Sequence, residues 1–404
     1  RLSSTDINAL QAEMDKLEDG IRGLNLILRN ENELERVIID ELREVQKKLS
    51  TKRLSVIEEE IEKIVITEEQ LIVDEQVVVG VTKEGYVKSS SIRSHNATDQ
   101  AVLRDNDSVL FAQECSTLET LLIFTTKGNY VYLPIYKIPT YKWKELGTHI
   151  NNIVQLEENE TIVKIIKISD FKAKKNLLFV TKNNLVKQTE LHEFDVSRYT
   201  KTVRAIALNK ADELVSVDIT DNIDSELLIF SEKGQALRFN LSEIPITSTT
   251  AKGVKGMNMN PNQHLATGII LKDFHDLLLL TNRGTIKRVN LMDIPKKKRT
   301  NKGVQIYKPV RSNPYLVSDV CLMNATQYRN RADVRVNTSL TEVIINAFDI
   351  KSDKTENGKS FIKKSLGESL FINIEEVEED MTITPLSEYQ RETDLELVQL
   401  ELFE

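Results

Sequence analysis

LLLLTNRGTIKRVNLMDIP, residues Leu277 to Pro295, has the pattern of a β-hairpin. Four apolar residues indicate a buried strand, and Thr-Asn-Arg-Gly indicates a tight turn in which Gly284 can adopt a positive φ. The returning strand alternates in character and carries Lys287 and Arg288. The stretch therefore predicts a hairpin with cations on its second strand.

The same pattern recurs along the chain. Its turn residues are Gly85, Gly128, Asn184, Gly234 and Gly284, separated by 43, 56, 50 and 50 residues. Asn replaces Gly well in a left-handed turn, so Asn184 fits the series. The four earlier copies are VVVGVTKEGYVKSS (77–90), LLIFTTKGNYVYLP (121–134), LLFVTKNNLVKQTE (177–190) and LLIFSEKGQALRFN (227–240). A weaker sixth unit is predicted around Val334 to Ile350.

Further apolar strands are expected between the hairpins, at 109–112, 163–168, 214–219, 266–271 and 316–323. About four strands in ~50 residues is typical of a radial blade architecture. Because such a unit cannot bury both its faces alone, neighbouring blades must stack around an axis. We therefore predict a mainly β chain with a six-bladed β-pinwheel or propeller-like domain, five blades being the alternative.

Apolar residues repeat with helical spacing before the first hairpin. Leu10, Met14, Leu17, Ile21, Leu24 and Leu28 form a heptad seam, and a second stripe runs from Leu34 to Leu49. A break is expected at 29–32, a further helix at 52–66, and N-terminal caps at 4–6. The predicted division is a helical coiled-coil stalk (1–70), a β-pinwheel (71–370) and an acidic mobile tail (371–404). Helix packing explains the stripe better than any ligand. The tail serves solubility or competes with nucleic acid for a basic surface.

Composition narrows the class of protein. The chain has 404 residues, 40% of them hydrophobic and 29% charged, which is ordinary for a globular protein. Two cysteines cannot form a disulfide framework, so a reducing cytoplasm is the default expectation. No apolar run approaches the ~20 residues of a membrane span, so no membrane partner is expected. Because the sequence opens on Arg1 without an initiator Met, we expect it to be part of a longer polypeptide.

Charge is distributed unevenly. Residues 1–76 carry 11 Lys/Arg against 19 Asp/Glu, residues 77–311 carry 34 against 25, and residues 312–404 carry 9 against 18. A basic middle between acidic ends favours a polyanion-binding module, with chance clustering on solvated faces as the alternative.

Cations recur at matching hairpin positions and in short basic runs. A radial arrangement would place them on a rim that contacts phosphates without reading sequence. The predicted DNA-binding residues are Lys83, Lys88, Arg93, Lys127, Lys142, Lys144, Lys182, Lys187, Lys233, Arg238, Lys252, Lys255, Arg283, Lys287, Arg288, Lys296, Lys297, Lys298, Arg299 and Lys302.

No catalytic or metal-binding motif is present. The five histidines share no metal-ligand spacing, and there is no P-loop, G-x-S-x-G or H-E-x-x-H. We therefore expect no catalytic residue, metal or cofactor site in this chain.

Several stretches resemble one family. RLSSTDINALQAEMDKL (1–17), ELERVIIDELREVQKKL (33–49) and TKRLSVIEEEIEKI (51–64) are similar to the stalk of bacterial type IIA topoisomerase A subunits. The stretches 75–97, 141–156, AKGVKGMNM (251–259), TNRGTIKRV (281–289) and ENGKSFI (356–362) resemble the topoisomerase IV type of Gram-positive bacteria.

The resemblance implies a C-terminal β-pinwheel in an assembly of two A and two B subunits, cytoplasmic and associated with the chromosome. ATP and Mg²⁺ would be bound by the B subunit, and the assembly would pass one duplex through another, decatenating and relaxing DNA. The catalytic tyrosine of the family lies upstream of this chain. Tyr199, in Arg198-Tyr199-Thr200, only echoes its setting.

Three functions stay open at this point. Gyrase A subunits carry a Gln-Arg-Arg-Gly-Gly-x-Gly box, whereas the corresponding stretch here is SHNATDQAVLRDND (94–107), which favours the topoisomerase IV type. The alternatives are a gyrase-type domain without its box and a propeller scaffold that binds protein.

Overall fold

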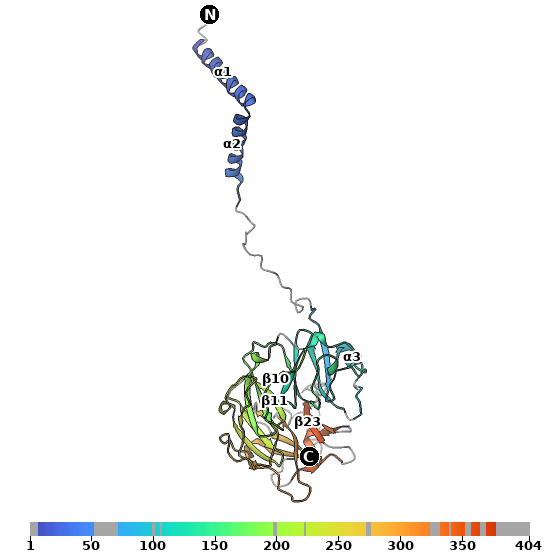
Figure 1. The fold of residues 1–404 in the computed structure, drawn as a ribbon. Helices are drawn as coiled ribbons and strands as arrows, with labels where there is room; N and C mark the ends of the chain where they lie inside the picture. The colour runs from blue at the N-terminus through green and yellow to red at the C-terminus, as the bar shows by residue number, and fades with distance from the viewer. Residues whose placement is uncertain are drawn as a thin grey trace, which may run out of the picture. The chain divides into compact units, whose positions relative to one another are not determined.

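The computed structural model describes residues 7–51, 72–98, 102–105, 107–196, 200–221, 224–271, 276–323, 332–338, 341–351, 357–363 and 369–376. The chain divides into two compact units, Arg1–Ile66 and Thr67–Glu404. The first is helical and the second is built from β-sheets (Figure 1).

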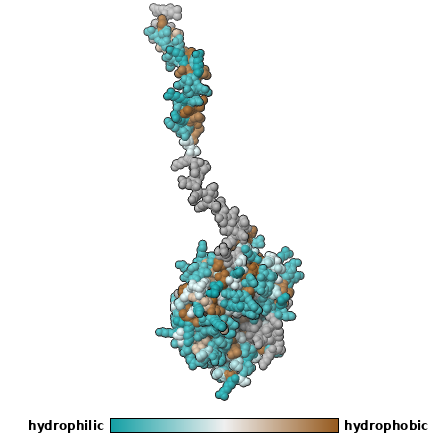
Figure 2. Space-filling model, in the orientation of Figure 1, coloured by the Kyte–Doolittle hydropathy of each residue, from teal (hydrophilic) through white to brown (hydrophobic). Residues whose placement is uncertain are grey.

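The helical unit contains α1 (Ile7–Arg29) and α2 (Glu31–Leu49). The predicted break is confirmed, because Asn30 caps α2 by accepting a hydrogen bond from the Asn32 amide at 3.1 Å. The apolar stripe is exposed on both helices, and Figure 2 shows it as brown patches along them. The expected caps at 4–6 and the helix at 52–66 lie outside the described residues. No described helix is long and apolar enough to span a membrane.

The second unit has six antiparallel sheets, which confirms the predicted six-bladed fold. Only the first sheet adds an α-helix, α3 (Ile92–Asn96), among the described residues. In spatial order, sheet 1 is β3 (Val109–Ser116), β1 (Gln76–Thr82), β2 (Tyr86–Ser91), β6 (Thr148–His149); sheet 2 is β7 (Ile162–Ile168), β4 (Thr120–Thr125), β5 (Asn129–Pro134), β10 (Val203–Arg204); sheet 3 is β11 (Leu214–Thr220), β8 (Asn176–Thr181), β9 (Leu185–Glu190), β14 (Val254–Lys255). Sheet 4 is β15 (Leu265–Leu271), β12 (Glu226–Ser231), β13 (Gln235–Asn240), β18 (Val304–Gln305); sheet 5 is β19 (Val317–Met323), β16 (Asp276–Thr281), β17 (Thr285–Asn290), β22 (Lys359–Ser360); sheet 6 is β23 (Ser369–Glu376), β20 (Ala332–Thr338), β21 (Glu342–Asn346).

All five predicted hairpins form. Their turn residues have positive φ, including Asn184 at 71° and Gly284 at 69°. Asn184 has a second role, because its side-chain amide bonds both the amide nitrogen and the carbonyl oxygen of Met257. The Asn184 side chain therefore does what glycine cannot, because it ties the turn to the segment that contains Met257.

The strands expected between hairpins also form, and each pairs with the hairpin before it. Strand β7, for example, pairs with β4 from Thr120↔Ile168 to Thr125↔Ile162. These inner strands of neighbouring sheets contact one another in chain order, from β3 and β7 through to β23. They therefore form the inner ends of the blades.

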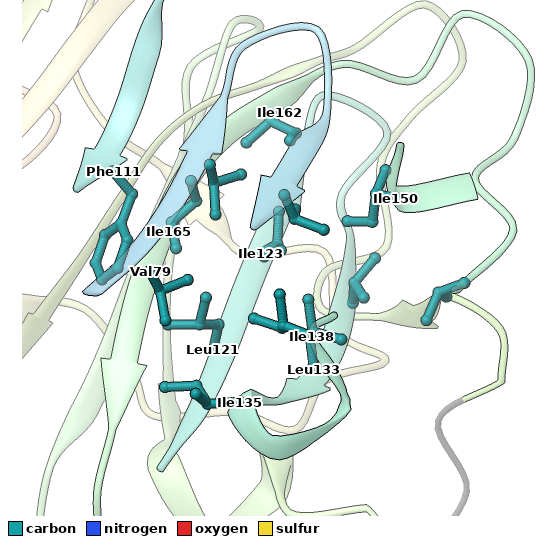
Figure 3. Close-up of a cluster of buried hydrophobic side chains, with 14 of the residues drawn as sticks. Val79, Phe111, Leu121, Ile123, Leu133, Ile135, Ile138, Ile150, Ile162 and Ile165 are labelled. Carbon is teal, nitrogen blue, oxygen red and sulfur yellow. The ribbon is translucent and has the colours of Figure 1, made fainter. Parts of the chain in front are cut away.

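The core lies between the sheets. Figure 3 shows the first cluster, in which Val79 and Phe111 of sheet 1 meet Leu121, Ile123 and Ile165 of sheet 2. Equivalent clusters fill the spaces between each following pair of sheets, up to sheets 5 and 6. Sheets 2 to 5 are therefore covered on both faces, which limits how many of their cations can reach solvent.

The start of the acidic tail is placed later than predicted. Strand β23 pairs with β20 from Thr338↔Ser369 to Ala332↔Glu376, so the boundary at residue 370 falls inside the last sheet. The alternating residues before the acidic run form this strand. Residues 377–404 lie outside the described residues.

Candidate nucleic-acid interface

Five loops exchange strands between neighbouring sheets. After each second hairpin strand from sheet 2 onward, the chain forms a short 3-10 helix and crosses back to the preceding sheet. There it adds the outermost strand, β6, β10, β14, β18 or β22. The helices are η2 (Ile135–Lys137), η4 (Leu191–Phe194), η5 (Leu241–Glu243), η6 (Leu291–Asp293) and η7 (Ala347–Asp349). We call residues 138–147, 195–202, 244–253, 294–303 and 350–358 the crossover loops.

A close backbone approach fixes the end of most crossover loops. Gly253 has a φ of 89°, and a Cβ there would lie 2.7 Å from the Val186 carbonyl oxygen and 3.1 Å from the Cβ of Lys187. Gly147, Gly303 and Gly358 make equivalent approaches to Val87, Ala236 and Ile286. Only glycine lets the loop lie this close to the strand it covers.

The predicted hairpin lysines lie beneath this cover. Lys88, Lys187 and Lys287 are 4%, 0% and 3% exposed. Lys187 Nζ donates to the Ala205 carbonyl at 2.9 Å, and Lys287 Nζ to the Ile306 carbonyl at 2.8 Å. Lys88 Nζ donates to the carbonyls of Trp143 and Glu145. Burial lowers the pKa of Lys88, and lowers that of Lys187 to about 8 despite the opposing effect of Glu193.

Two predicted arginines are held in ion pairs with the adjacent strand of their own hairpin. Arg238 pairs with Glu226, and Arg288 Nε donates to Asp276 at 2.7 Å. Arg288 also donates to the Ile350 carbonyl, at 3.3 Å. The structure therefore does not present the three lysines and these two arginines on the surface, which disfavours the prediction that they contact DNA. Stacking of neighbouring sheets turns the hairpin strands inward.

The cations at the hairpin tips reach solvent, and several have partners there. Lys127 pairs with Glu157 at 3.4 Å, and Lys182 pairs with Glu213 at 2.8 Å. Arg283 stacks over Tyr315 at 4.1 Å from the ring centroid. Lys233 is exposed and Lys83 is half-buried. The tips therefore mix positive and negative charge.

The crossover loops and strands carry exposed cations at equivalent positions in consecutive sheets. Lys201, Lys252 and Lys302 each precede the crossover strand by two residues, and Arg204 and Lys255 end two of those strands. All five are exposed, and no carboxylate oxygen of the described residues lies within 4.0 Å of their charged nitrogens. Sequence reasoning missed Lys201 and Arg204. The recurring KTVR, KGVK and KGVQ at 201–204, 252–255 and 302–305 could have revealed them.

Neighbouring crossover loops are joined edge to edge by backbone hydrogen bonds. The Thr300 amide donates to the Gly256 carbonyl at 2.8 Å, and the Asn258 amide to the Asn301 carbonyl at 3.0 Å. Ala207 donates in the same way to Ala251, at 3.1 Å. The exposed cations of sheets 2, 3 and 4 therefore lie along one connected backbone surface.

The basic run 296–299 divides between structural and exposed side chains. Lys296 pairs with Glu226 at 2.9 Å, and Lys297 donates to the Lys302 carbonyl at 3.4 Å. Arg299 Nε donates to the Glu243 carbonyl at 3.0 Å, and its guanidinium also reaches the Lys255 carbonyl. Lys298 is exposed. The densest run in the sequence therefore presents fewer free charges than its composition suggests.

The remaining predicted residues surround a buried tryptophan in sheet 1. Lys142, Lys144 and Arg93 are exposed or half-buried, whereas Trp143 is buried against Gly80 and the His95 ring, 4.5 Å away between centroids. Trp143 is thus a packing residue and presents no face for stacking on a base.

No catalytic constellation is found in the part of the chain described. No group of three or more His, Cys, Asp or Glu there could hold a metal ion. Cys115 is buried, and burial raises the pKa of its thiol to about 11. Tyr199 lies outside the described residues.

Comparison with known proteins identifies the repeat. The family model described as "DNA gyrase C-terminal domain, beta-propeller" matches residues 119–169, 175–221, 225–272 and 275–313. The A subunit of DNA topoisomerase 4 from Bacillus subtilis (strain 168) is 39% identical over 274 residues, which are 67% of this chain and 34% of that protein. The same subunit from Staphylococcus aureus (strain MRSA252) is 39% identical over 261 residues, 64% of this chain and 32% of that protein. The chain thus spans about a third of the length of the curated relatives it matches.

Solved structures agree. A crystal structure of the C-terminal domain of DNA topoisomerase IV superposes with a TM-score of 0.69 at 34% identity, covering 76% of this chain and 95% of that one. A DNA gyrase A C-terminal domain shares the fold, with a TM-score of 0.58 at 22% identity over 75% of this chain and 99% of that one.

Proposed function

Because the chain belongs to the family of the DNA gyrase C-terminal domain, beta-propeller, we propose that it binds double-stranded DNA along its crossover loops. One observation carries the proposal. Lys201, Lys252 and Lys302 are exposed at equivalent positions of three consecutive sheets. Cations repeated in this way suit the repeated phosphates of a duplex.

The binding is electrostatic. Lysines and arginines that contact phosphates release counterions and fix the position of the duplex, but carry no sequence information. Because the loops lie on sheets that turn about a common centre, a duplex that follows them has to bend. The cost of bending is offset by the additional phosphate contacts.

The chemistry belongs to a larger assembly. By analogy with its curated relatives, the chain is part of a topoisomerase A subunit that dimerises and joins two B subunits. The B subunits would hold ATP and Mg²⁺, and the assembly would act on chromosomal DNA in the bacterial cytoplasm. In that setting the β-sheet unit would hold one duplex for passage through the other, leading to decatenation and relaxation.

Salt-titrated binding of a linear duplex tests the proposal. In a triple variant, Lys201, Lys252 and Lys302 are replaced by Gln. Its matched control replaces the tip residues Lys127, Lys182 and Lys233 by Gln. These residues lie in the same three sheets, and their replacement removes the same positive charge. We expect the slope of log K against log salt to fall by about 0.9 for each lost phosphate contact in the loop variant. At ~0.1 M salt its affinity should fall at least roughly tenfold.

The control variant separates two ways in which the proposal can fail. If both triple variants weaken duplex binding equally, the proposal that the chain binds DNA stands. Its assignment to the crossover loops would then fail. If the wild-type chain shows no salt-dependent binding, the proposal that it binds DNA fails. A propeller scaffold that binds protein would then be favoured.

The supercoiling assay distinguishes the two family types. The stretch 94–107 has no Gln-Arg-Arg-Gly-Gly-x-Gly box, which supports the topoisomerase IV type. Reconstituted with its B subunit, the full A subunit should relax and decatenate plasmids with ATP. Negative supercoils introduced into relaxed plasmid would instead indicate a gyrase.

A further inference from the structure

The last sheet differs from the other five at its outer edge. Strands β2, β5, β9, β13 and β17 are each covered by a crossover strand, whereas sheet 6 has three strands and ends at β21. No described residue pairs with the outer side of β21. An edge of this kind presents unpaired N–H and C=O groups that can receive another strand.

A side chain at this edge is also uncovered. Ile344 is the third residue from the end of β21, and Arg335↔Ile344 corresponds in the repeat to Leu278↔Arg288. At the same position Ser89, Tyr132 and Gln188 are buried. The side chains of Arg238 and Arg288 are 15% and 18% exposed. Ile344 is 53% exposed.

The backbone at this position normally bonds a crossover loop. The Ser89 amide donates to Pro139 at 3.2 Å, and the carbonyls of Gln188 and Arg238 accept from Thr247 and Lys297, both at 2.9 Å. In sheet 6 the edge therefore lacks, within the described residues, both the backbone partner and the cover that the other sheets share.

The end of β23 lies where such a segment would begin. Glu376 pairs with Ala332, beside the Asp333↔Asn346 pair that ends β21, so β23 finishes at the same end of the sheet as β21. The crossover loops first bond the second hairpin strand near this end, as Lys297 does at Arg238, and their strands then pair with the first two residues of that strand, toward its other end. Crossing three interstrand spacings takes roughly 15 Å, which about five extended residues can span. After Glu376, 28 residues remain.

We propose that residues 397–402, Leu-Val-Gln-Leu-Glu-Leu, add to β21 as the fourth strand of sheet 6. Three of the five crossover strands begin with valine, and Val398-Gln399-Leu400 matches Val304-Gln305-Ile306 of sheet 4 in type. Leu397 to Leu402 combines β-branched and alternating apolar residues with no proline or glycine, as strand addition requires. The C-terminal segment thus completes the sheet, and its leucines cover Ile344.

Labelling of an introduced thiol tests this assignment. Ile344→Cys is made in the full chain and in a chain ending at Glu376, and the rate of reaction with a maleimide is measured. Wild-type chain supplies the background from Cys115 and Cys321, which are buried and half-buried. Met292→Cys is the control, because Met292 is 70% exposed on η6 and should react equally fast in both lengths.

We expect the thiol introduced by Ile344→Cys to react at least tenfold more slowly in the full chain than in the shortened one. A peptide of residues 393–404 added to the shortened chain should restore protection, and Leu400→Asp in the full chain should remove it. Equally fast labelling at both lengths would overturn the proposal. Equally slow labelling would also overturn it, because another segment, such as residues 52–71 or a second copy of the chain, would then cover the edge.

Discussion

Lys187 and Lys252 belong to the same repeat and lie close together, yet their environments are opposite. Lys187 lies on β9 and is fully buried beneath Gly253, where an added Cβ would lie 3.1 Å from the Cβ of Lys187. Lys252, the residue before that glycine, is exposed and donates to the Asn209 side chain at 3.0 Å. A single residue of loop separates a lysine that supports the fold from one that is available to a polyanion.

The difference shows that lysine has two uses in this architecture. On the hairpin strands its long stem packs between sheets and its ammonium group satisfies a backbone carbonyl of a neighbouring segment. On the crossover loops the side chains of Lys201, Lys252 and Lys302 are exposed. Sheet stacking decides which use applies, because the strand side chains face a neighbouring sheet.

Replacement of Lys187 by Ala should give the largest effect. It removes buried methylene groups and leaves the Ala205 carbonyl without this donor, which we expect to cost about 3 kcal/mol of unfolding free energy. Lys252→Ala should change it by less than about 0.5 kcal/mol. Urea unfolding of the two variants measures the difference. Similar losses would remove the distinction between strand and loop lysines.

The pH dependence of stability is the next largest effect. Because the pKa of Lys187 is lowered to about 8 in the folded chain, the folded state binds fewer protons than the unfolded state from about pH 8 up to the ordinary lysine pKa of ~10.4. Stability from this group therefore rises with pH across that window, by about 1–2 kcal/mol between pH 7 and 9.5.

Lys187→Met supplies the control for that measurement. Methionine keeps most of the volume and cannot titrate, so its unfolding free energy should lack this rise. Other groups contribute equally to both chains and cancel in the comparison, and stopping at pH 9.5 avoids the buried tyrosines, whose pKa values burial raises. Parallel pH profiles for wild type and Lys187→Met would contradict the assignment.

Sequence reasoning predicts the fold well where the pattern is long. An apolar run, a Gly or Asn turn and a returning strand identify every hairpin from β1/β2 to β16/β17. The crossover strands are not predictable in this way, because Val304–Gln305 and its equivalents have two residues each and no period. Strand exchange between blades therefore comes only from the structure.

The site is harder to predict because a propeller sheet has two covered faces. Alternation along β17 suggests an outward Lys287, but Thr285, Ile286, Lys287 and Val289 are all buried. Stacked blades, which the repeat itself predicts, leave no solvent face for that lysine. Lys201 does not fit the Lys-Gly-Val pattern of residues 252–254 and 302–304, because Thr202 replaces the glycine.

Substitution of Arg299 tests whether every exposed or half-buried cation of the crossover loops contributes to DNA binding. Its guanidinium bonds the carbonyls of Glu243 and Lys255, so it connects adjacent crossover segments. Arg299→Gln should cost about 1 kcal/mol of stability, because carbonyl acceptors lose a charged donor. The salt slope of duplex binding should stay nearly unchanged. A slope reduced by a full contact would instead place Arg299 among the phosphate-binding cations.

Lys296 and Lys298 give the smallest and most closely matched contrast, two residues apart in one crossover loop. Lys298 is exposed with no carboxylate of the described residues within 4.0 Å, whereas Lys296 lies 2.9 Å from Glu226. Lys298→Gln should lower duplex affinity about two- to fivefold and the salt slope by about 0.9, as for one lost phosphate contact. Lys296→Gln should change the slope less, because its ammonium group has to leave Glu226 before it can bind a phosphate. Equal slopes for the two variants would mean that pairing with a carboxylate does not decide which loop lysines contact DNA, and the sorting of cations would then rest on burial alone.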